Sequence, residues 1–204
     1  MAARPLRFTA ASDEGLKPGM VVGLYGGSFD PPHRGHRHVA MTAMKRLGLD
    51  RVWWVVSPHN PLKPRAPEDL DARMDAVERL INHPRHVVTD IEARIGTRYT
   101  ADLIAWLVTG YPGVRFVWIM GADGLGSFHR WQDWRAIAAH VPIVVVSRPG
   151  PSLKWRLGRA AREMAGARVC ATQARKLVLS GAPGWTYITA PLHAEASSVL
   201  RRGR

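Results

Sequence analysis

The feature that most constrains the fold of this chain is a regular alternation of short apolar runs with longer segments of helical periodicity. Residues 21–25 form an apolar run that ends in Gly26-Gly27, as a buried parallel strand does. A helical pattern follows from Arg34 to Leu47, and Gly48 ends it. The same order recurs along the chain, with strand-like runs at 52–56, 86–91, 115–120 and 142–147 and helical patterns at 69–81, 99–108 and 131–139.

Strands that alternate with helices are typical of βαβ units and a parallel sheet. Right-handed crossovers then place helices on both faces of that sheet. We therefore expect an α/β fold, a doubly wound parallel sheet in a single domain over residues 20–204, after a flexible N-terminal tail at 1–19. The region 151–184 is less regular, with a candidate helix at 153–164, and a last short strand is expected at 185–189.

The composition is that of a soluble globular chain, with 46% hydrophobic and 22% charged residues. No apolar stretch approaches the roughly 20 residues of a membrane-spanning helix, and the N-terminal residues lack the apolar segment of a secretory signal. We therefore expect a cytoplasmic protein with no membrane partner. The single cysteine, Cys170, cannot form an internal disulfide, and we expect it to be a small buried apolar side chain.

A surplus of positive charge indicates a polyanionic partner. The net charge is +13, from 29 Lys and Arg against 16 Asp and Glu. Such a charge attracts nucleic acid, a membrane surface or phosphorylated small molecules. The arginines are scattered, and no nucleic-acid-binding module is evident. The charge thus supports a phosphate-handling protein without selecting its partner.

Conspicuous loops follow four of the expected strands, beginning at Gly26, Ser57, Gly121 and Ser147. Because parallel strands point the same way, these loops lie at one edge of the sheet. Ligands of such sheets bind beyond the carboxyl ends of the strands. We expect the binding site there.

The loop after the first strand has the features of a phosphate site. Gly26 and Gly27 let backbone N–H groups approach a ligand closely. A phosphate at the N-terminus of the following helix meets unpaired donors and the positive end of the helix dipole. The alternative is that these glycines serve only a tight turn.

Two histidines strengthen the phosphate interpretation. His33 and His36 are three residues apart and are expected on one helical face. An imidazole there can donate a hydrogen bond to a phosphate oxygen as charge builds during a displacement. The alternatives are a metal site that includes His38 and Asp30, or plain surface histidines.

The eleven residues from Gly26 to His36, Gly-Gly-Ser-Phe-Asp-Pro-Pro-His-Arg-Gly-His, resemble the signature of the nucleotidyltransferase superfamily with an H/T-x-G-H motif. The form with Gly-Gly-Ser/Thr-Phe-Asp-Pro-x-His is most similar to that of bacterial nicotinate-nucleotide adenylyltransferases. The resemblance implies a Rossmann-like sheet, which agrees with the alternation described above. Further similarity extends over about residues 20–201.

The resemblance implies an ATP site. Residues 57–64 resemble a second loop in which Pro-Pro-His-Lys is usual, but this chain has Leu62 in place of the histidine and keeps Lys63. Residues 196–201 resemble a Ser-Ser-Thr-x-Ile-Arg motif, with Ala196 and Ser198 as departures. The implied catalytic residues are His33, His36 and Lys63, although Lys63 has the alternative of a solvated side chain. The implied ATP-binding residues are Gly26, Gly27, Ser28, Phe29, His33, His36, Ser197, Ser198 and Arg201.

The resemblance also implies an acceptor site. Arg98-Tyr99-Thr100 is similar to a Ser-Tyr-Thr segment, and Gly121-Ala122-Asp123 followed by Trp131 is similar to a Gly-Ala-Asp and Trp pattern. Asp123 could instead be a helix N-cap, and Trp131 could instead be a core residue. We expect Trp134 to be a core residue. The implied acceptor-binding residues are Ser28, Tyr99, Thr100, Asp123 and Trp131.

The implied reaction transfers the adenylyl group of ATP to nicotinate mononucleotide, which is a step of NAD biosynthesis. Mg²⁺ would be held largely by the phosphates and water, with no metal ligands from the protein. Nicotinamide mononucleotide and pantetheine phosphate are alternative acceptors, and a basic nucleic-acid-binding module without catalysis is an alternative of a different class. The expected partners are small molecules rather than nucleic acid, and the oligomeric state is left open.

Overall fold

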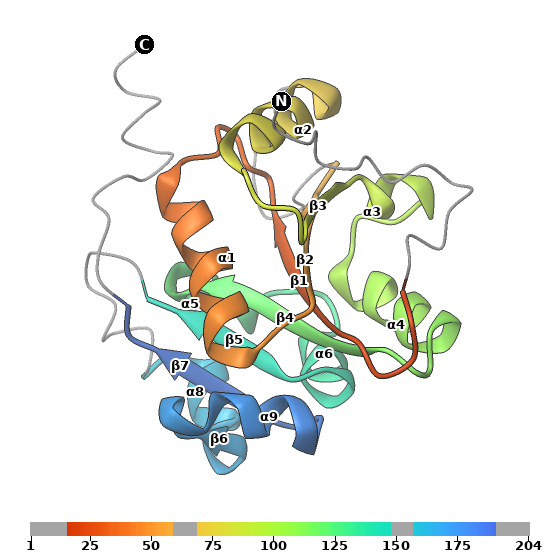
Figure 1. The fold of residues 1–204 in the computed structure, drawn as a ribbon. Coiled ribbons are helices and arrows are strands. Elements are labelled where there is room, and N and C mark those ends of the chain that lie inside the picture. Colours follow the sequence, from red (N-terminus) through yellow and green to blue (C-terminus); the bar gives the residue numbers. More distant parts are fainter. Residues whose placement is uncertain (1–15, 59–68, 148–156, 191–204) are drawn as a thin grey trace.

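A parallel sheet of seven strands organises the chain in the computed structural model, which describes residues 16–58, 69–147 and 157–190 (Figure 1). The strand order is β3-β2-β1-β4-β5-β7-β6, and every neighbouring pair is parallel. The strands are β1 Val21–Gly27, β2 Arg51–Val56, β3 His86–Thr89, β4 Arg115–Gly121, β5 Ile143–Val146, β6 Arg168–Val169 and β7 Trp185–Ile188.

The sheet changes its direction of growth between β1 and β4. From β1 the chain builds outward through β2 to β3, and it then returns to place β4 on the other side of β1. In open α/β sheets this switch point lies beside the ligand-binding crevice at the carboxyl ends of the strands. The expected α/β doubly wound sheet is confirmed, and the loop that follows β1 lies at its switch point.

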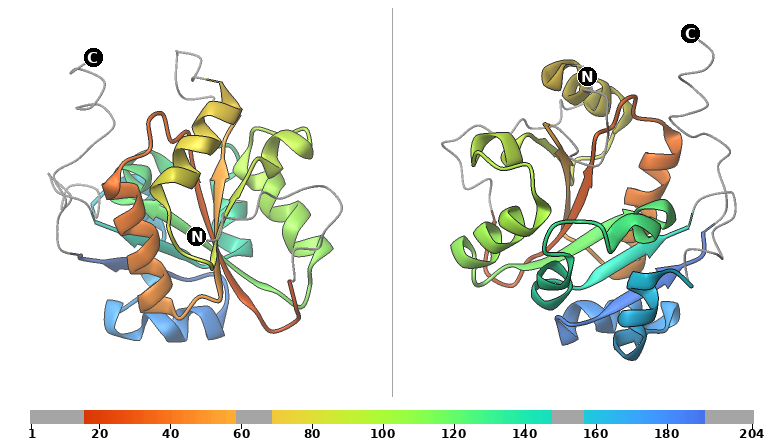
Figure 2. Two further views of the ribbon diagram at one scale, coloured as in Figure 1. Left: turned by 45° about the horizontal axis from the view of Figure 1, so that its top comes forward. Right: turned by 180° about the vertical axis from the view of Figure 1, so that it is seen from behind.

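Helices cover both faces of the sheet, as the two views of Figure 2 show. Because successive strand residues point to opposite faces, Leu24 belongs to one buried cluster and Tyr25 to the other. Residues of α3, α4, α5, α6 and α8 join the first cluster, and residues of α1, α2 and α9 join the second. The helices are α1 Arg34–Leu47, α2 Leu70–Leu80, α3 Ile91–Arg94, α4 Thr100–Gly110, α5 Ala122–Phe128, α6 Trp134–His140, α8 Arg159–Glu163 and α9 Ala174–Ser180.

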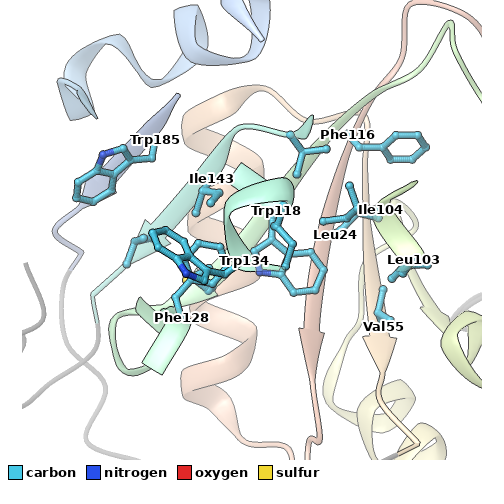
Figure 3. Packing of buried hydrophobic residues seen from close by; sticks show 14 of the residues in the cluster. Leu24, Val55, Leu103, Ile104, Phe116, Trp118, Phe128, Trp134, Ile143 and Trp185 are labelled. Atoms are coloured by element: carbon cyan, nitrogen blue, oxygen red, sulfur yellow. The ribbon is translucent and has the colours of Figure 1, made fainter. Parts of the chain in front are cut away.

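Large aromatic side chains dominate the first cluster, as Figure 3 shows for Trp118, Phe128, Trp134 and Trp185. Phe128 and Trp134 meet edge to face with ring centroids 5.4 Å apart. Each buried large apolar side chain stabilises the fold by roughly 1.5–3 kcal/mol. Trp134 is therefore a core residue, as its sequence pattern predicts.

The long elements agree closely with the sequence patterns. α1 spans Arg34–Leu47 and ends at Gly48, whose φ of 71° lies in the left-handed region that glycine tolerates. The pattern at 131–139 is helical only from Trp134, since Trp131 lies in the turn before α6. The pattern at 153–164 contains α8 in its last part, and residues 153–156 lie outside the described ranges.

Some of the short elements were not expected from the sequence. α5 has the sequence Ala-Asp-Gly-Leu-Gly-Ser-Phe, whose two glycines disfavour a helix in isolation. α3, α9 and β6 are also short, and two 3₁₀ turns lie at Ala165–Ala167 and Ala171–Gln173. These segments carry too few residues, or too weak an apolar pattern, to be marked by the sequence.

The expectation that Cys170 is buried was wrong, because the residue is exposed. It follows β6, a two-residue strand at the edge of the sheet, and Thr172 donates a hydrogen bond to its sulfur over 3.2 Å. At the start of the described chain, Leu16 packs against the first cluster, and the Gly19 N–H donates to the Gly113 carbonyl oxygen over 2.7 Å. In the described part of the chain, no helix has the length and apolar character needed to span a membrane.

Candidate active site

The loop between β1 and α1 turns sharply at Phe29, which has a φ of 45°. Its ring is 3% exposed and meets the rings of Tyr25 and His36 edge to face, with centroid distances of 5.4 and 5.2 Å. A Cβ added to Gly27 would lie 3.0 Å from Cζ of this ring. A larger residue at position 27 would therefore require the Phe29 ring to shift by a few tenths of an ångström.

Gly26 has a second steric reason to be glycine. A Cβ added there would lie 2.4 Å from Cη2 of Trp118, whose indole from β4 is 1% exposed. Trp118 also meets Trp131 edge to face at 6.0 Å. Close packing at the switch point thus explains both glycines of the loop, alongside the expected phosphate contact.

His33 and His36 form a reciprocal cap at the start of α1. His33 is the N-cap residue, with an extended backbone, and its Nδ1 accepts a hydrogen bond from the Gly35 N–H over 3.1 Å. The Nδ1 of His36 accepts one from the His33 N–H over 3.2 Å. The two ring centroids lie 3.8 Å apart. The sequence placed both histidines on one helical face, whereas the structure brings them together through a capping box.

This cap also selects the tautomer of both rings. A neutral imidazole carries one N–H, so an Nδ1 that accepts a hydrogen bond leaves the proton on Nε2. Each ring then carries its proton on Nε2, and that atom of His33 is buried. This is the form needed to hydrogen bond a phosphate oxygen. Among the described residues, no group of three His, Cys, Asp or Glu side chains gathers as a candidate metal site.

Arg73 of α2 joins the ends of β1 and β2. Its Nη1 donates to the carbonyl oxygens of Ser28 and Ser57 over 2.7 and 2.8 Å, and its Nη2 donates to that of Pro58 over 3.5 Å. The Ser57 N–H donates in turn to the Gly27 carbonyl oxygen over 3.0 Å. The loop after β1 is therefore held against the end of β2 through backbone carbonyls.

Glu92 is a buried carboxyl group beside the same strand end. Burial raises its pKa to about 7, against a smaller opposing effect of a hydrogen bond from the Ser57 side chain. One carboxyl oxygen, Oε2, has no hydrogen-bond partner among the described residues. Near neutral pH the group is thus partly protonated, which lowers the cost of its burial.

The residues implied for the acceptor lie in four places: Ser28 follows β1, Tyr99 and Thr100 lie at the start of α4, Asp123 lies in α5, and Trp131 lies in the turn before α6. Tyr99 precedes α4 and Thr100 begins it, and the Arg98 guanidinium lies 5.4 Å from the centre of the Tyr99 ring. Asp123 is exposed in the first turn of α5, where the N-cap residue is Gly121, so the reading of Asp123 as an N-cap was wrong. Trp131 is half-buried and packs on Phe128 at 5.4 Å.

Several residues implied for the site lie outside the described ranges, namely Lys63, Ser197, Ser198 and Arg201. Sequence reasoning missed Arg73, Trp118 and Glu92. A signal existed for Arg73, because it is four residues before the buried Val77 and thus on the apolar side of α2. No comparable signal marks the contact of Trp118 with Gly26, since these residues meet only across the sheet.

Comparison with known proteins shows the family of the chain. The sequence model of the cytidylyltransferase-like family matches residues 24–203. A protein of Cereibacter sphaeroides named probable nicotinate-nucleotide adenylyltransferase is 54% identical over 89% of this chain and 96% of its own length. Proteins of the same name from Roseobacter denitrificans and Methylorubrum extorquens are each 48% identical, over 91% and 89% of this chain and 93% and 99% of their own lengths.

Solved structures share the fold. The nicotinic acid mononucleotide adenylyltransferase of Plasmodium falciparum, in a complex with NaAD, superposes with a TM-score of 0.66 at 16% identity, over 90% of this chain and 83% of its own. Its complex with APC gives a TM-score of 0.64 with the same coverage. The cap at His33 and His36 lies at the switch point of this fold. The sequence and fold comparisons agree that the chain belongs to the cytidylyltransferase-like family, among the nicotinate-nucleotide adenylyltransferases.

Proposed function

We propose that this chain transfers the adenylyl group of ATP to nicotinate mononucleotide, producing nicotinate adenine dinucleotide and pyrophosphate. The observation that carries the proposal is the reciprocal cap of His33 and His36, which brings the two imidazole rings together at the N-terminus of α1 beside the switch point and leaves the proton of each ring on Nε2. The relatives that are 46–54% identical bear the name of this activity.

The mechanism needs no protein nucleophile. A phosphate oxygen of the acceptor attacks the α-phosphorus of ATP, and the bond to the bridging oxygen of pyrophosphate breaks. Catalysis then consists of alignment and charge stabilisation. His33 and His36 donate to the phosphate oxygens as charge builds in the transition state. Lys63 and Arg201 neutralise the outer phosphates, and Ser197 and Ser198 add hydrogen bonds.

The acceptor occupies the opposite side of the switch point in this proposal. Trp131 offers a flat aromatic face to the pyridine ring. Asp123, which is exposed in the first turn of α5, orients the mononucleotide. Ser28, Tyr99 and Thr100 shape the rest of the pocket.

Mg²⁺ enters with ATP in this proposal. It gives up its water reluctantly and is commonly bound through substrate phosphates. It supplies charge neutralisation at those phosphates, and no residue of this chain is assigned to it. Because the reaction consumes ATP, we place it in the cytoplasm.

One experiment separates this function from its rivals. The purified chain is incubated with ATP, Mg²⁺ and one of three acceptors: nicotinate mononucleotide, nicotinamide mononucleotide or pantetheine phosphate. Pyrophosphate release is then measured. We expect the fastest release with nicotinate mononucleotide. Faster release with either other acceptor would reassign the substrate, and salt-sensitive retention on DNA without any pyrophosphate release would overturn the enzymatic proposal.

A further inference from the structure

Arg73 is a buried cation to which the proposed reaction gives no part. Its side chain is 2% exposed, and it is the one lysine or arginine that is buried within residues 16–58, 69–147 and 157–190. It lies in the first half of α2, whose N-terminus is capped by Asp69. The burial of a charged guanidinium in this position therefore needs a physical explanation.

The partners of Arg73 are backbone atoms at the carboxyl edge of the sheet. One nitrogen, Nη1, bonds the carbonyl oxygens of Ser28 and Ser57, which follow β1 and β2. Ser28 directly precedes Phe29, where the loop turns through a positive φ. Arg73 thus holds the loop at the point where it leaves the sheet and begins its path to His33.

Stability alone does not explain this arrangement. Withdrawal of a charge from water is costly, and well-packed apolar residues of similar volume often stabilise a fold as well or better. A planar guanidinium has N–H groups in fixed directions, so it holds two acceptors in a set geometry relative to each other. The acceptors here belong to two separate loops of the site.

We propose that Arg73 is a positioning residue for adenylyl transfer, because it sets the path of the loop from Ser28 to His33 relative to the end of β2. The proposal rests on the proposed function. Arg73 touches no substrate in this scheme, and it acts through the Ser28 carbonyl on the placement of His33 and His36. A displacement of about 1 Å at such groups can lower a rate by roughly 100-fold.

The test compares Arg73→Lys and Arg73→Gln with the unchanged chain in the pyrophosphate assay with nicotinate mononucleotide. Lys keeps the charge without the planar donor pair, and Gln donates from an uncharged amide. We expect kcat to fall by roughly 10- to 100-fold in both variants, with KM for ATP and for the acceptor little changed. Melting temperatures are recorded for each variant, and kcat is measured well below them.

Two controls lie on the same helix. Arg79→Lys changes an exposed arginine of α2 and should leave kcat unchanged. Val77→Ala removes buried volume from α2 and no side-chain hydrogen bond to either loop, so it should lower the melting temperature and leave kcat unchanged. This second control separates loss of positioning from loss of stability.

Three results would overturn the inference: wild-type kcat in either Arg73 variant, an equal fall of kcat in Val77→Ala, or failure of both Arg73 variants to fold. The last result would assign Arg73 to stability. Failure of the proposed function gives a different result, because the unchanged chain itself would then release no pyrophosphate with any acceptor.

Discussion

His36 serves both the fold and the proposed chemistry. Its Nδ1 accepts the hydrogen bond from the His33 N–H, which leaves the proton on Nε2, the proposed donor toward phosphate. The proposed catalytic role and the helix cap therefore belong to one imidazole ring, and a substitution there should show two separate effects.

For His36→Ala we expect kcat to fall by roughly 100- to 1,000-fold with KM little changed, because the lost hydrogen bond forms in the transition state. The lost cap should lower the free energy of unfolding by about 1 kcal/mol. Pyrophosphate assays and urea denaturation measure the two effects. His140→Ala, at the exposed end of α6, is the control, and wild-type turnover in His36→Ala would remove the residue from the mechanism.

The space beside Gly26 is limited by one side chain, that of Trp118 on the neighbouring strand β4. For Gly26→Ala we expect a loss of roughly 1–3 kcal/mol in the free energy of unfolding, because the new methyl group would lie 2.4 Å from Trp118 Cη2. Gly110→Ala is the control, since nothing lies within 4 Å of a Cβ there.

A double-mutant cycle identifies the cause of that loss. Phe in place of Trp118 removes the ring atoms that collide with the new methyl group. Urea denaturation should therefore show Gly26→Ala with Trp118→Phe to be more stable than the sum of the single changes predicts. Strict additivity would show that Trp118 is not the obstacle.

At the scale of elements, α2 links the core to the site. One side of the helix buries Met74 and Val77, while Arg73 reaches the loops after β1 and β2. Its position depends on Asp69, whose Oδ1 accepts hydrogen bonds from the N–H groups of Asp71 and Ala72 over 3.0 and 3.2 Å.

Asp69→Ala should lower the free energy of unfolding by about 1 kcal/mol, because two N–H groups at the start of α2 lose their acceptor. Asp69→Asn retains an oxygen acceptor and should keep most of that stability. Urea denaturation of the two variants checks this, and equal stability of both would show that the cap contributes nothing.

Length helps a sequence to predict an element, and the short strands β5 and β7 were predicted because each is a distinct apolar run. α1 and β1 carry enough residues for helical or strand periodicity to emerge, and both were predicted almost to the residue. α5 and α9 are seven residues long, and tertiary packing holds them in place despite a weak local preference. The same limit applies to β6, a strand of two residues.

At the scale of the whole molecule, two buried groups set opposite dependences of stability on pH. Burial raises the pKa of Glu92 to about 7. Between pH 4.5 and 7 the unfolded chain releases this proton while the folded chain keeps it, so stability falls as the pH rises.

His86 acts in the opposite direction. Its pKa is lowered to about 3, first by burial and then by His83, Arg37 and Arg85, and its Nδ1 accepts a hydrogen bond from Trp54 Nε1. Between pH 6.5 and about 3, His86 is protonated in the unfolded chain and stays neutral in the folded chain. Stability due to this group is therefore lost as the pH falls below 6.5.

Glu92→Gln isolates the first effect, because glutamine keeps an acceptor for the Ser57 hydroxyl and does not ionise. The change in the free energy of unfolding caused by Glu92→Gln should be more favourable at pH 8 than at pH 5, by at most roughly 3 kcal/mol. Urea denaturation at both pH values measures the difference, and an equal difference at both would contradict the raised pKa.

Glu163→Gln is the matched control for that measurement. Hydrogen bonds from Arg159 and Arg135 lower the pKa of the Glu163 carboxyl group. It therefore remains ionised in the folded and the unfolded chain between pH 5 and 8. Its effect on stability should be the same at both pH values.

The sequence by itself determined the alternation of strands and helices and the parallel sheet, and it predicted the loop from Gly26 to His36 as the centre of the site. Those features depend on residues close together in the sequence, and the apolar periodicity and turn residues of such segments can be recognised directly in the sequence. The exposure of Cys170, the cap between His33 and His36, and the contacts of Gly26 and Arg73 were decided by the tertiary structure. The last two depend on close packing and hydrogen bonds between distant segments: Arg73 and Ser28 are 45 residues apart, and only the folded sheet brings them together.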